Sequence, residues 1–349
     1  MKKLLKLIVF LIALAIVFTI YLKLGKSIKT PSIREENKIV AYISPISIDY
    51  LRSLNIQSDS VKIEEELSNG SNYKRYIASY LSEGNKVYGL LTLPLTEIPK
   101  GGFPAIVFNH GYIPPSQYVT TQSYVSYVDY LARNGFVVFK IDYRGNGNSE
   151  GDASGSYFSS AYTIDAINAL KALQKFDQIN PNRIGMWGHS MAGNVVLRAM
   201  LVSKDIKAGV IWSGAVYSYK DFVTYKINDS NYAHKPFETK EGTAQKDRET
   251  SSEIQKIRND SQTIDFNNSF WSSISLTKNI KYLTSPLQIH QATDDPVVNI
   301  GYSRDLVRVL KDNDKNYEFY EYSGGGHNIN SPYFETAMER TVKFFMDKL

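Results

Sequence analysis

Gly188-His189-Ser190-Met191-Ala192-Gly193 decides the fold, because it stands between an apolar strand pattern at 183–187 and a helical pattern at 194–201. A serine on a sharp strand-to-helix turn projects its hydroxyl out of the sheet and forms a nucleophile elbow. Such a turn needs small neighbours, which Gly188 and Ala192 supply. The helix adds its N-terminal dipole and the backbone N–H of Met191, both directed at negative charge beside Ser190. The alternative is a glycine-rich turn that contains a serine by chance.

A serine nucleophile requires a general base, and the chain has five candidates: His110, His189, His234, His290 and His327. In folds with such an elbow, the acid and then the histidine follow the serine at the carboxyl ends of later strands. His290 lies inside the apolar run 286–292, where a side chain usually packs. His327 follows three glycines in a loop directly after the strand-like run 317–322. We therefore predict His327 as the base, ahead of the other four.

The acid should follow the strand before the one that leads to His327. At that position the chain reads Thr293-Asp294-Asp295-Pro296-Val297-Val298. A carboxylate there would accept the ring N–H of His327 and hold its productive tautomer. Position along the chain alone leaves Asp294 and Asp295 as alternatives.

An oxyanion hole is the remaining part, and Phe108-Asn109-His110-Gly111-Tyr112 can supply it. The apolar strand pattern at 105–108 ends in the His-Gly pair. The backbone N–H of Tyr112 would then be the second donor beside that of Met191. We expect Asn109 and His110 to shape this loop and to take no part in proton transfer.

These motifs together resemble the α/β-hydrolase superfamily. Within it, the chain is similar to the catalytic domain of the prolyl oligopeptidase family of serine peptidases and to their esterase-like relatives. The matching stretches run in order from 108 to 327 and are 108–112, Asp142-Tyr143-Arg144-Gly145-Asn146-Gly147-Asn148-Ser149-Glu150-Gly151, the elbow, 292–298 and 326–327. The run 291–295 can be laid over the superfamily's His-Gly-Thr-x-Asp pattern, which favours Asp295 as the acid and leaves Asp294 as a solvated residue.

The resemblance implies a serine hydrolase that cleaves an acyl bond of a peptide or ester substrate through Ser190, His327 and Asp295. It favours a serine peptidase, with a carboxylesterase as the alternative. A catalytically silent binding module is less favoured, and a lyase or peroxidase on the same fold stays open. The implied fold is α/β, namely a mostly parallel, doubly wound α/β-hydrolase sheet with an antiparallel N-terminal hairpin and a lid insertion.

The rest of the chain fits one catalytic domain at 73–349. Apolar strand patterns occur at 105–108, 136–141, 184–187, 208–212, 287–290 and 318–322, and two strand patterns at 76–81 and 86–93 flank a hairpin turn. Helical spacing of apolar residues separates them, as in the stretches 164–173 and 334–345. Residues 25–72 read as a tether and an N-terminal extension.

The strand–helix alternation stops between 217 and 283, and a polar, charged stretch takes its place. An insertion here could cover Ser190, so we predict a lid or cap. Its aromatic residues could line an apolar substrate pocket. Alternatively, most of them only anchor the insertion onto the sheet: Tyr217, Tyr219, Phe222, Tyr225, Phe237, Phe270 and Trp271.

The N-terminus predicts a location. Residues 7–22 are apolar apart from Thr19 and follow three lysines, so 1–24 reads as a single-pass signal anchor or transmembrane helix. The stretch Gly25-Lys26-Ser27 is a poor cleavage site, which favours a retained anchor over a cleaved signal peptide. We therefore expect a membrane-tethered protein whose catalytic domain lies outside the cytoplasm. With no cysteine, the chain has no lipobox and no disulfide framework.

Charge and motifs argue against other partners. The net charge is +5, but six lysines and no acid lie in the first 30 residues, so the remainder is close to neutral and not suited to nucleic acid. The sequence has no Cys/His cluster, and residues 142–151 lack the spacing of a dinucleotide loop. We expect no cofactor and no metal.

Overall fold

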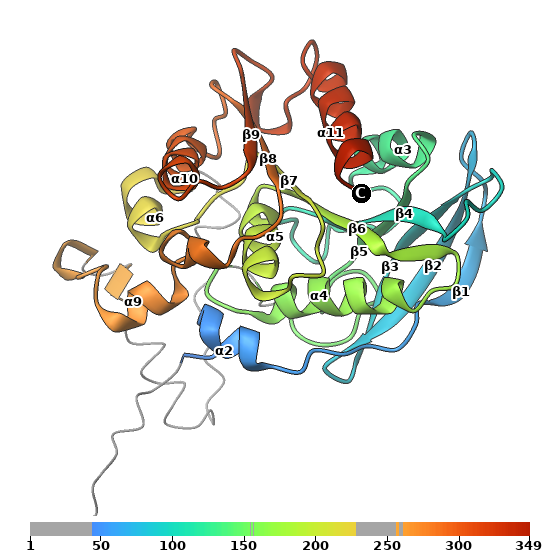
Figure 1. Cartoon of the computed structure of the whole chain (residues 1–349), viewed down its shortest axis with the longest axis horizontal. Coiled ribbons are helices and arrows are strands. Elements are labelled where there is room, and N and C mark those ends of the chain that lie inside the picture. The colour runs from blue at the N-terminus through green and yellow to red at the C-terminus, as the bar shows by residue number, and fades with distance from the viewer. Residues whose placement is uncertain (1–43, 154, 156, 228–255, 258–260) are drawn as a thin grey trace, which may run out of the picture. The chain divides into compact units, whose positions relative to one another are not determined.

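The centre of the molecule is a mixed β-sheet, seen in a computed structural model that describes residues 44–153, 155, 157–227, 256–257 and 261–349 (Figure 1). Nine strands of the described residues form it, in the order β1-β2-β3-β5-β4-β6-β7-β8-β9. Their bounds are β1 Lys62–Leu67, β2 Tyr73–Ser82, β3 Asn85–Pro94, β4 Phe103–Asn109, β5 Val137–Ile141, β6 Ile179–His189, β7 Gly209–Trp212, β8 Leu287–Ala292 and β9 Tyr317–Tyr322. The strands from β1 to β3 pair antiparallel, β3 also pairs antiparallel with β5, and the strands from β5 across to β9 are parallel. The predicted α/β sheet with an antiparallel hairpin is confirmed.

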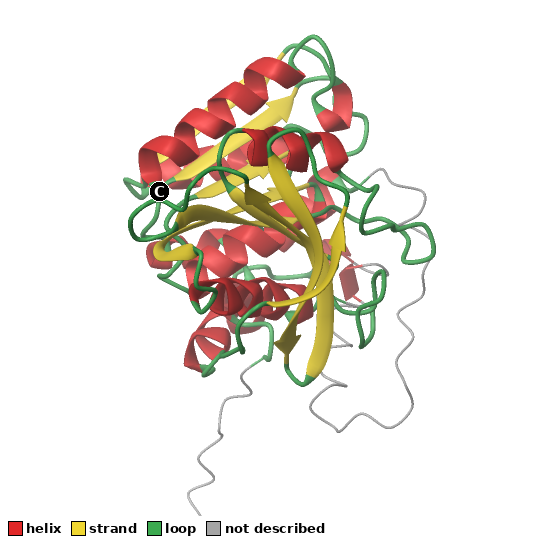
Figure 2. Cartoon of the chain, turned by 90° about the vertical axis from the view of Figure 1, so that its right-hand side faces the viewer, coloured by secondary structure: helices red, strands yellow, loops and turns green. Residues whose placement is uncertain are grey.

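Two apolar cores cover the two faces of this sheet, because side chains alternate between the faces along each strand. In β4, Ala105 and Val107 belong to one core, whereas Ile106 and Phe108 belong to the other. The first core packs on α4 (Ala161–Gln174), α5 (Met191–Val202) and α10 (Gly301–Asp312). The second packs on α3 (Val125–Arg133) and α11 (Phe334–Lys348). Figure 2 shows helices on both sides of the strands.

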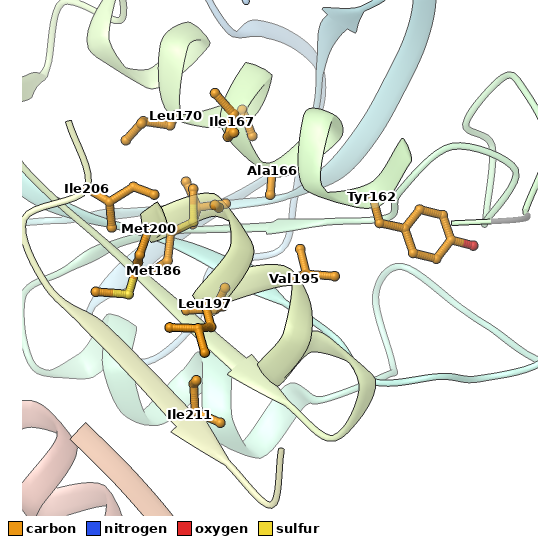
Figure 3. Packing of buried hydrophobic residues seen from close by; sticks show 14 of the residues in the cluster. Tyr162, Ala166, Ile167, Leu170, Met186, Val195, Leu197, Met200, Ile206 and Ile211 are labelled. Atoms are coloured by element: carbon orange, nitrogen blue, oxygen red, sulfur yellow. The ribbon is translucent and has the colours of Figure 1, made fainter. Parts of the chain in front are cut away.

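The two helices beside the elbow are almost completely buried. In Figure 3, Ala166, Ile167 and Leu170 of α4 lie near Val195, Leu197 and Met200 of α5 and Met186 of β6. Burying one valine, leucine, isoleucine or methionine side chain contributes about 1.5–3 kcal/mol to the free energy of folding. The strand and helix that flank the elbow are therefore held by the interior of the protein.

The chain order places the site at a switch point of the sheet. Strand β4 leads through α3 to β5 on one side, whereas β6 lies on its other side. A crevice opens at the carboxyl ends of the strands where the order reverses in this way. The loop after β4 and the elbow after β6 meet there.

The N-terminal part of the described chain contains two elements that the sequence patterns did not predict. Helix α2 (Ile48–Ser53) and strand β1 lie within 25–72, the stretch that we expected to be a tether and an extension. β1 pairs with β2 and forms an edge of the sheet.

Part of the predicted lid, 217–283, lies outside the described residues, including Phe237 and the charged run at 240–249. The described part forms α6 (Tyr219–Tyr225), η1 (Ser261–Thr263), α9 (Ser269–Ile274) and η2 (Thr277–Tyr282). Its aromatic residues Tyr217, Tyr219 and Trp271 are buried in the core, and Phe222, Tyr225 and Phe270 pack against it. That arrangement matches the anchoring alternative, and a lid that selects substrates stays a prediction.

The predicted localisation has to be corrected. Across the part of the chain that the structure describes, no helix is long and apolar enough to cross a membrane. The apolar run at 7–22, on which the prediction of a membrane anchor and an extracytoplasmic domain rested, lies outside the described residues.

Candidate active site

Ser190 sits on a strained turn between β6 and α5. Its φ of 55° and ψ of −122° are unfavourable for a residue with a side chain, and strain of this kind often marks functional sites. The backbone N–H of Ser190 donates to the carbonyl of Trp212 at 2.9 Å, which ties the turn to β7. A Cβ at Gly188 would lie 2.7 Å from the carbonyl oxygen of Ala192, so only glycine fits there. The predicted elbow geometry is present, including the need for a small residue before it.

His327 and Asp295 meet at the carboxyl ends of β9 and β8. Nδ1 of His327, in η3 (Gly326–Asn328), lies 2.9 Å from Oδ2 of Asp295. The Asp295 side chain is fully buried, while that of His327 is 17% exposed and faces the pocket. Oδ1 of Asp295 accepts from the backbone N–H groups of Val297 and Val298 at 2.8 and 2.9 Å. Burial alone would raise the pKa of Asp295, but His327 and these N–H groups outweigh it and lower that pKa.

The neighbouring Asp294 has a different place. It is exposed, and its Oδ1 accepts from the backbone N–H of Gly326 at 2.9 Å. It therefore holds the loop of His327 and does not contact the ring, so it is more than a solvated acid. Gln291, which the sequence did not single out, donates from Nε2 to Oδ2 of Asp295 at 2.9 Å and accepts from the Ser303 hydroxyl at 3.0 Å.

The loop after β4 passes directly beside the elbow. A Cβ at Gly111 would lie 3.0 Å from Cβ of Ser190 and 2.6 Å from the hydroxyl oxygen of Tyr124. Tyr112 follows it and lines the same pocket as Ser190. Met191 is the first residue of α5, and the first N–H groups of a helix have no acceptor within that helix. Tyr112 and Met191 thus belong to the two segments that meet at Ser190, and their N–H groups stay the predicted oxyanion donors.

A cavity of about 1130 Å³ opens over these residues. Its lining is rich in hydroxyl and amide groups, and Glu335 is the one acidic side chain among the described residues that line it. Ser190 and His327 both face this cavity, although no hydrogen bond joins their side chains among the described residues. Such contacts are often long without substrate. None of the described residues of 217–283 lines the cavity.

The other histidines that the structure describes are buried. Burial lowers the pKa of His110, of His189 and of His290 to about 3 in each case, so each ring is neutral. His290 packs between Tyr322 and Gln288, to which its ring nitrogens hydrogen-bond. His234 lies outside the described residues.

The glycine-rich stretch at 142–151 stabilises the loops around the site. Asp142 accepts from the hydroxyls of Tyr118 and Thr120 at 2.6 and 2.5 Å, which fixes the segment that follows the loop after β4. Arg144 forms an ion pair with the buried Asp165 at 2.7 Å. These residues build a scaffold. Among the described residues, no group of three or more His, Asp or Glu side chains could hold a metal ion.

The fold and this site define a serine hydrolase of the α/β-hydrolase type. The chain belongs to the family described as "Serine aminopeptidase, S33", which matches residues 104–331. The resemblance inferred from the motifs is therefore confirmed at the level of the superfamily and its peptidase and esterase members.

Individual relatives match at low identity. A probable dipeptidyl-aminopeptidase B of Aspergillus terreus is 23% identical over 313 residues, which cover 83% of this chain and 30% of that protein. The dipeptidyl peptidase 4 structure of Porphyromonas gingivalis has a TM-score of 0.60 at 19% identity and covers 80% of this chain and 36% of its own. An acetyl xylan esterase of Paenibacillus sp. R4 has a TM-score of 0.61 at 16% identity, with 85% and 92% covered. The chain spans 30%, 46% and 51% of the first three curated relatives that it matches.

Proposed function

We propose that this chain is a serine peptidase similar to the prolyl oligopeptidases, in which Ser190 is the nucleophile, His327 the general base and Asp295 the acid of a triad. The observation that carries the proposal is the buried Asp295 paired at 2.9 Å with His327, which faces the same cavity as the strained Ser190. A buried carboxylate is costly unless it is paired and hydrogen-bonded. Asp295 takes part in four hydrogen bonds, three of which fix its orientation, and the fourth joins it to Nδ1 of His327.

The proposed reaction has two steps. Oγ of Ser190 bonds to the substrate carbonyl carbon while its proton passes to Nε2 of His327, and the carbonyl oxygen becomes an oxyanion between the N–H groups of Tyr112 and Met191. His327 returns the proton to the leaving nitrogen or oxygen, whose bond to carbon breaks. Water then attacks the acyl-enzyme in the same way and releases the acid. Asp295 stays ionised throughout and stabilises the imidazolium.

A carboxylesterase is the second candidate. The esterase neighbours match this chain over nearly their whole length, whereas the peptidase neighbours carry long additional segments. A peptidase must protonate a poor amine leaving group, and an esterase expels an alcohol more readily. Turnover of aminoacyl amides against matched esters therefore discriminates the two.

A fluorophosphonate probe tests the shared chemistry, because only an activated serine reacts with it. We expect covalent labelling of one residue, Ser190, identified by mass spectrometry, and none in Ser190→Ala. Labelling that persists in Ser190→Ala contradicts the proposed triad. Absence of labelling in the folded wild type would support the silent binding module instead.

A further inference from the structure

Three hydrogen bonds connect the oxyanion loop, the elbow and the backbone of His327. The N–H of Gly111 donates to the hydroxyl oxygen of Tyr124 at 2.9 Å. That oxygen lies 2.7 Å from Nδ1 of His189, and Nε2 of His189 lies 2.9 Å from the carbonyl oxygen of His327. Tyr124 comes from the turn before α3, and His189 directly precedes the nucleophile. The connection thus joins the segments that follow β4 and β9 to the last residue of β6.

The direction of every proton in this chain of bonds is determined. The carbonyl of His327 can only accept, so Nε2 of His189 carries the hydrogen. A neutral imidazole then accepts at Nδ1, which requires the Tyr124 hydroxyl to donate there. The oxygen of Tyr124 is left to accept from Gly111. Each donor in this chain of bonds has an acceptor, and the Tyr124 oxygen both donates to His189 and accepts from Gly111.

Burial supports this arrangement. His189 is 2% exposed, and burial lowers its pKa to about 3, which gives the neutral ring that these bond directions assume. Burial also raises the pKa of Tyr124, so its hydroxyl keeps its proton. The Tyr124 ring packs edge-on against Phe108 and Trp187, which prevents it from swinging away.

We propose that Tyr124 and His189 form a positioning pair that sets the distance between the oxyanion loop and His327 across Ser190. This proposal rests on the proposed function. Gly111 precedes the predicted oxyanion donor Tyr112, and the other end of the connection is the backbone of the base itself. Because the Tyr124 proton is committed to His189, the phenol is not a third oxyanion donor.

Such a connection matters because the reaction tolerates only a small misplacement of the reacting groups. Reacting groups have to be held within about 0.5 Å of the productive geometry, and a misplacement of about 1 Å can cost on the order of 10²-fold in rate. The loop of Gly111 and the loop of His327 are far apart in sequence. A direct bonded link between them transmits their positions with less freedom than packing alone.

The first experiment measures how fast the fluorophosphonate probe inactivates the wild type and single variants, and separates the rate constant kinact from the binding constant KI. Tyr124→Phe removes the hydroxyl and should lower kinact by about 10–100-fold while KI changes by less than about threefold, because binding is left and alignment is lost. Tyr143→Phe is the matched control. Its hydroxyl is fully buried and has no hydrogen-bond partner among the described residues, so kinact should not change.

The second experiment separates positioning from packing at His189. The amide N–H of His189→Gln can still donate to the carbonyl of His327, so kinact should fall by less than about tenfold, whereas His189→Leu keeps the volume without a donor and should fall by on the order of 10²-fold. Tyr124→Phe combined with His189→Leu should be no slower than the slower single variant, because both interrupt one connection. Equal losses in His189→Gln and His189→Leu would mean that the site needs the histidine only for packing, and would overturn the proposal.

A measurement on the unaltered protein covers variants that fail to fold. Nitrogen-15 spectra of the imidazoles at pH 7 should show His189 as the neutral tautomer with hydrogen on Nε2. The other tautomer or a protonated ring would overturn the positioning pair. Labelling of Ser190 in the wild type with unchanged kinact in Tyr124→Phe and His189→Leu rejects this proposal alone, whereas labelling that survives in Ser190→Ala rejects the proposed function.

Discussion

Replacing Asp295 by asparagine should inactivate the enzyme, and the structure shows how. Oδ1 of Asp295 accepts from the backbone N–H groups of Val297 and Val298, whereas Oδ2 accepts from His327 and Gln291. The amide oxygen of an asparagine must face the two backbone donors, since an NH₂ group there would leave donors unsatisfied at about 1–3 kcal/mol each. The NH₂ group is therefore turned toward His327.

That orientation imposes the wrong tautomer. The amide donates to Nδ1 of His327, which places the ring hydrogen on Nε2, where the proton of Ser190 should be received. The charge that balances the imidazolium is also lost. A comparable substitution in a serine protease lowers kcat by about 10⁴-fold, and we expect a loss of that order here, which corresponds to about 5 kcal/mol of transition-state stabilisation.

The assay is the rate of fluorophosphonate labelling together with turnover of an activated ester, with circular dichroism to verify the fold. Asp294→Asn is the matched control. Its amide oxygen can still accept from the N–H of Gly326, so activity should stay within about threefold of wild type. If Asp295→Asn keeps more than about a tenth of the activity, or if Asp294→Asn is the inactive variant, the assignment of the acid fails.

Three further outcomes follow from the same geometry. Ser190→Ala should lower turnover by on the order of 10⁶-fold, measured on the ester that the wild type hydrolyses best; a residual rate of a tenth would place the nucleophile elsewhere. Gly111→Ala puts a Cβ 2.6 Å from the Tyr124 hydroxyl and should lower kcat by about 10–100-fold with a folded circular dichroism spectrum, and an unchanged kcat would contradict the close approach of this loop. Urea unfolding at pH 7, 6 and 5 should show that the free energy of unfolding decreases as the pH is lowered, by up to about 1.4 kcal/mol per pH unit for each buried histidine. The reason is that between the ordinary pKa of 6.5 and the folded value of about 3 only the unfolded chain binds the proton. If the free energy of unfolding is constant from pH 7 to 5, the rings of His110, His189 and His290 bind protons in the folded state as they do in the unfolded chain.

The site residues that the sequence predicts lie just after the carboxyl ends of individual strands. Ser190, Asp295 and His327 each follow an apolar run, and neighbouring glycines or a proline mark the turn. Parallel strands bring such ends to one edge of the sheet, so strand order and local pattern suffice to collect them. The sheet itself was predictable for the same reason, since its central strands are apolar runs, broken in β5 by Lys140 alone.

The parts that the sequence missed depend on contacts between loops. Tyr124 stands in a segment with no motif, and Gln291 only opens the run that was matched for its acid. Their roles follow from partners 65 and 4 residues away that only the folded chain identifies. β1 was missed for another reason. Five of its six residues are exposed and four are charged, as suits an edge strand that must avoid pairing with other chains, so the apolar alternation is absent.

His189 and His327, which line the same cavity as Ser190, have opposite surroundings, and this difference separates their proposed roles. Nδ1 of His327 faces a buried carboxylate, which favours the positive ring that forms when a proton arrives. Nδ1 of His189 faces a hydroxyl donor and Nε2 a carbonyl, a pair that fits only one neutral tautomer. Their rings lie 4.6 Å apart, so a charge on His189 would also repel the imidazolium of His327. A histidine kept neutral at this distance can hold the base in place without competing for its proton.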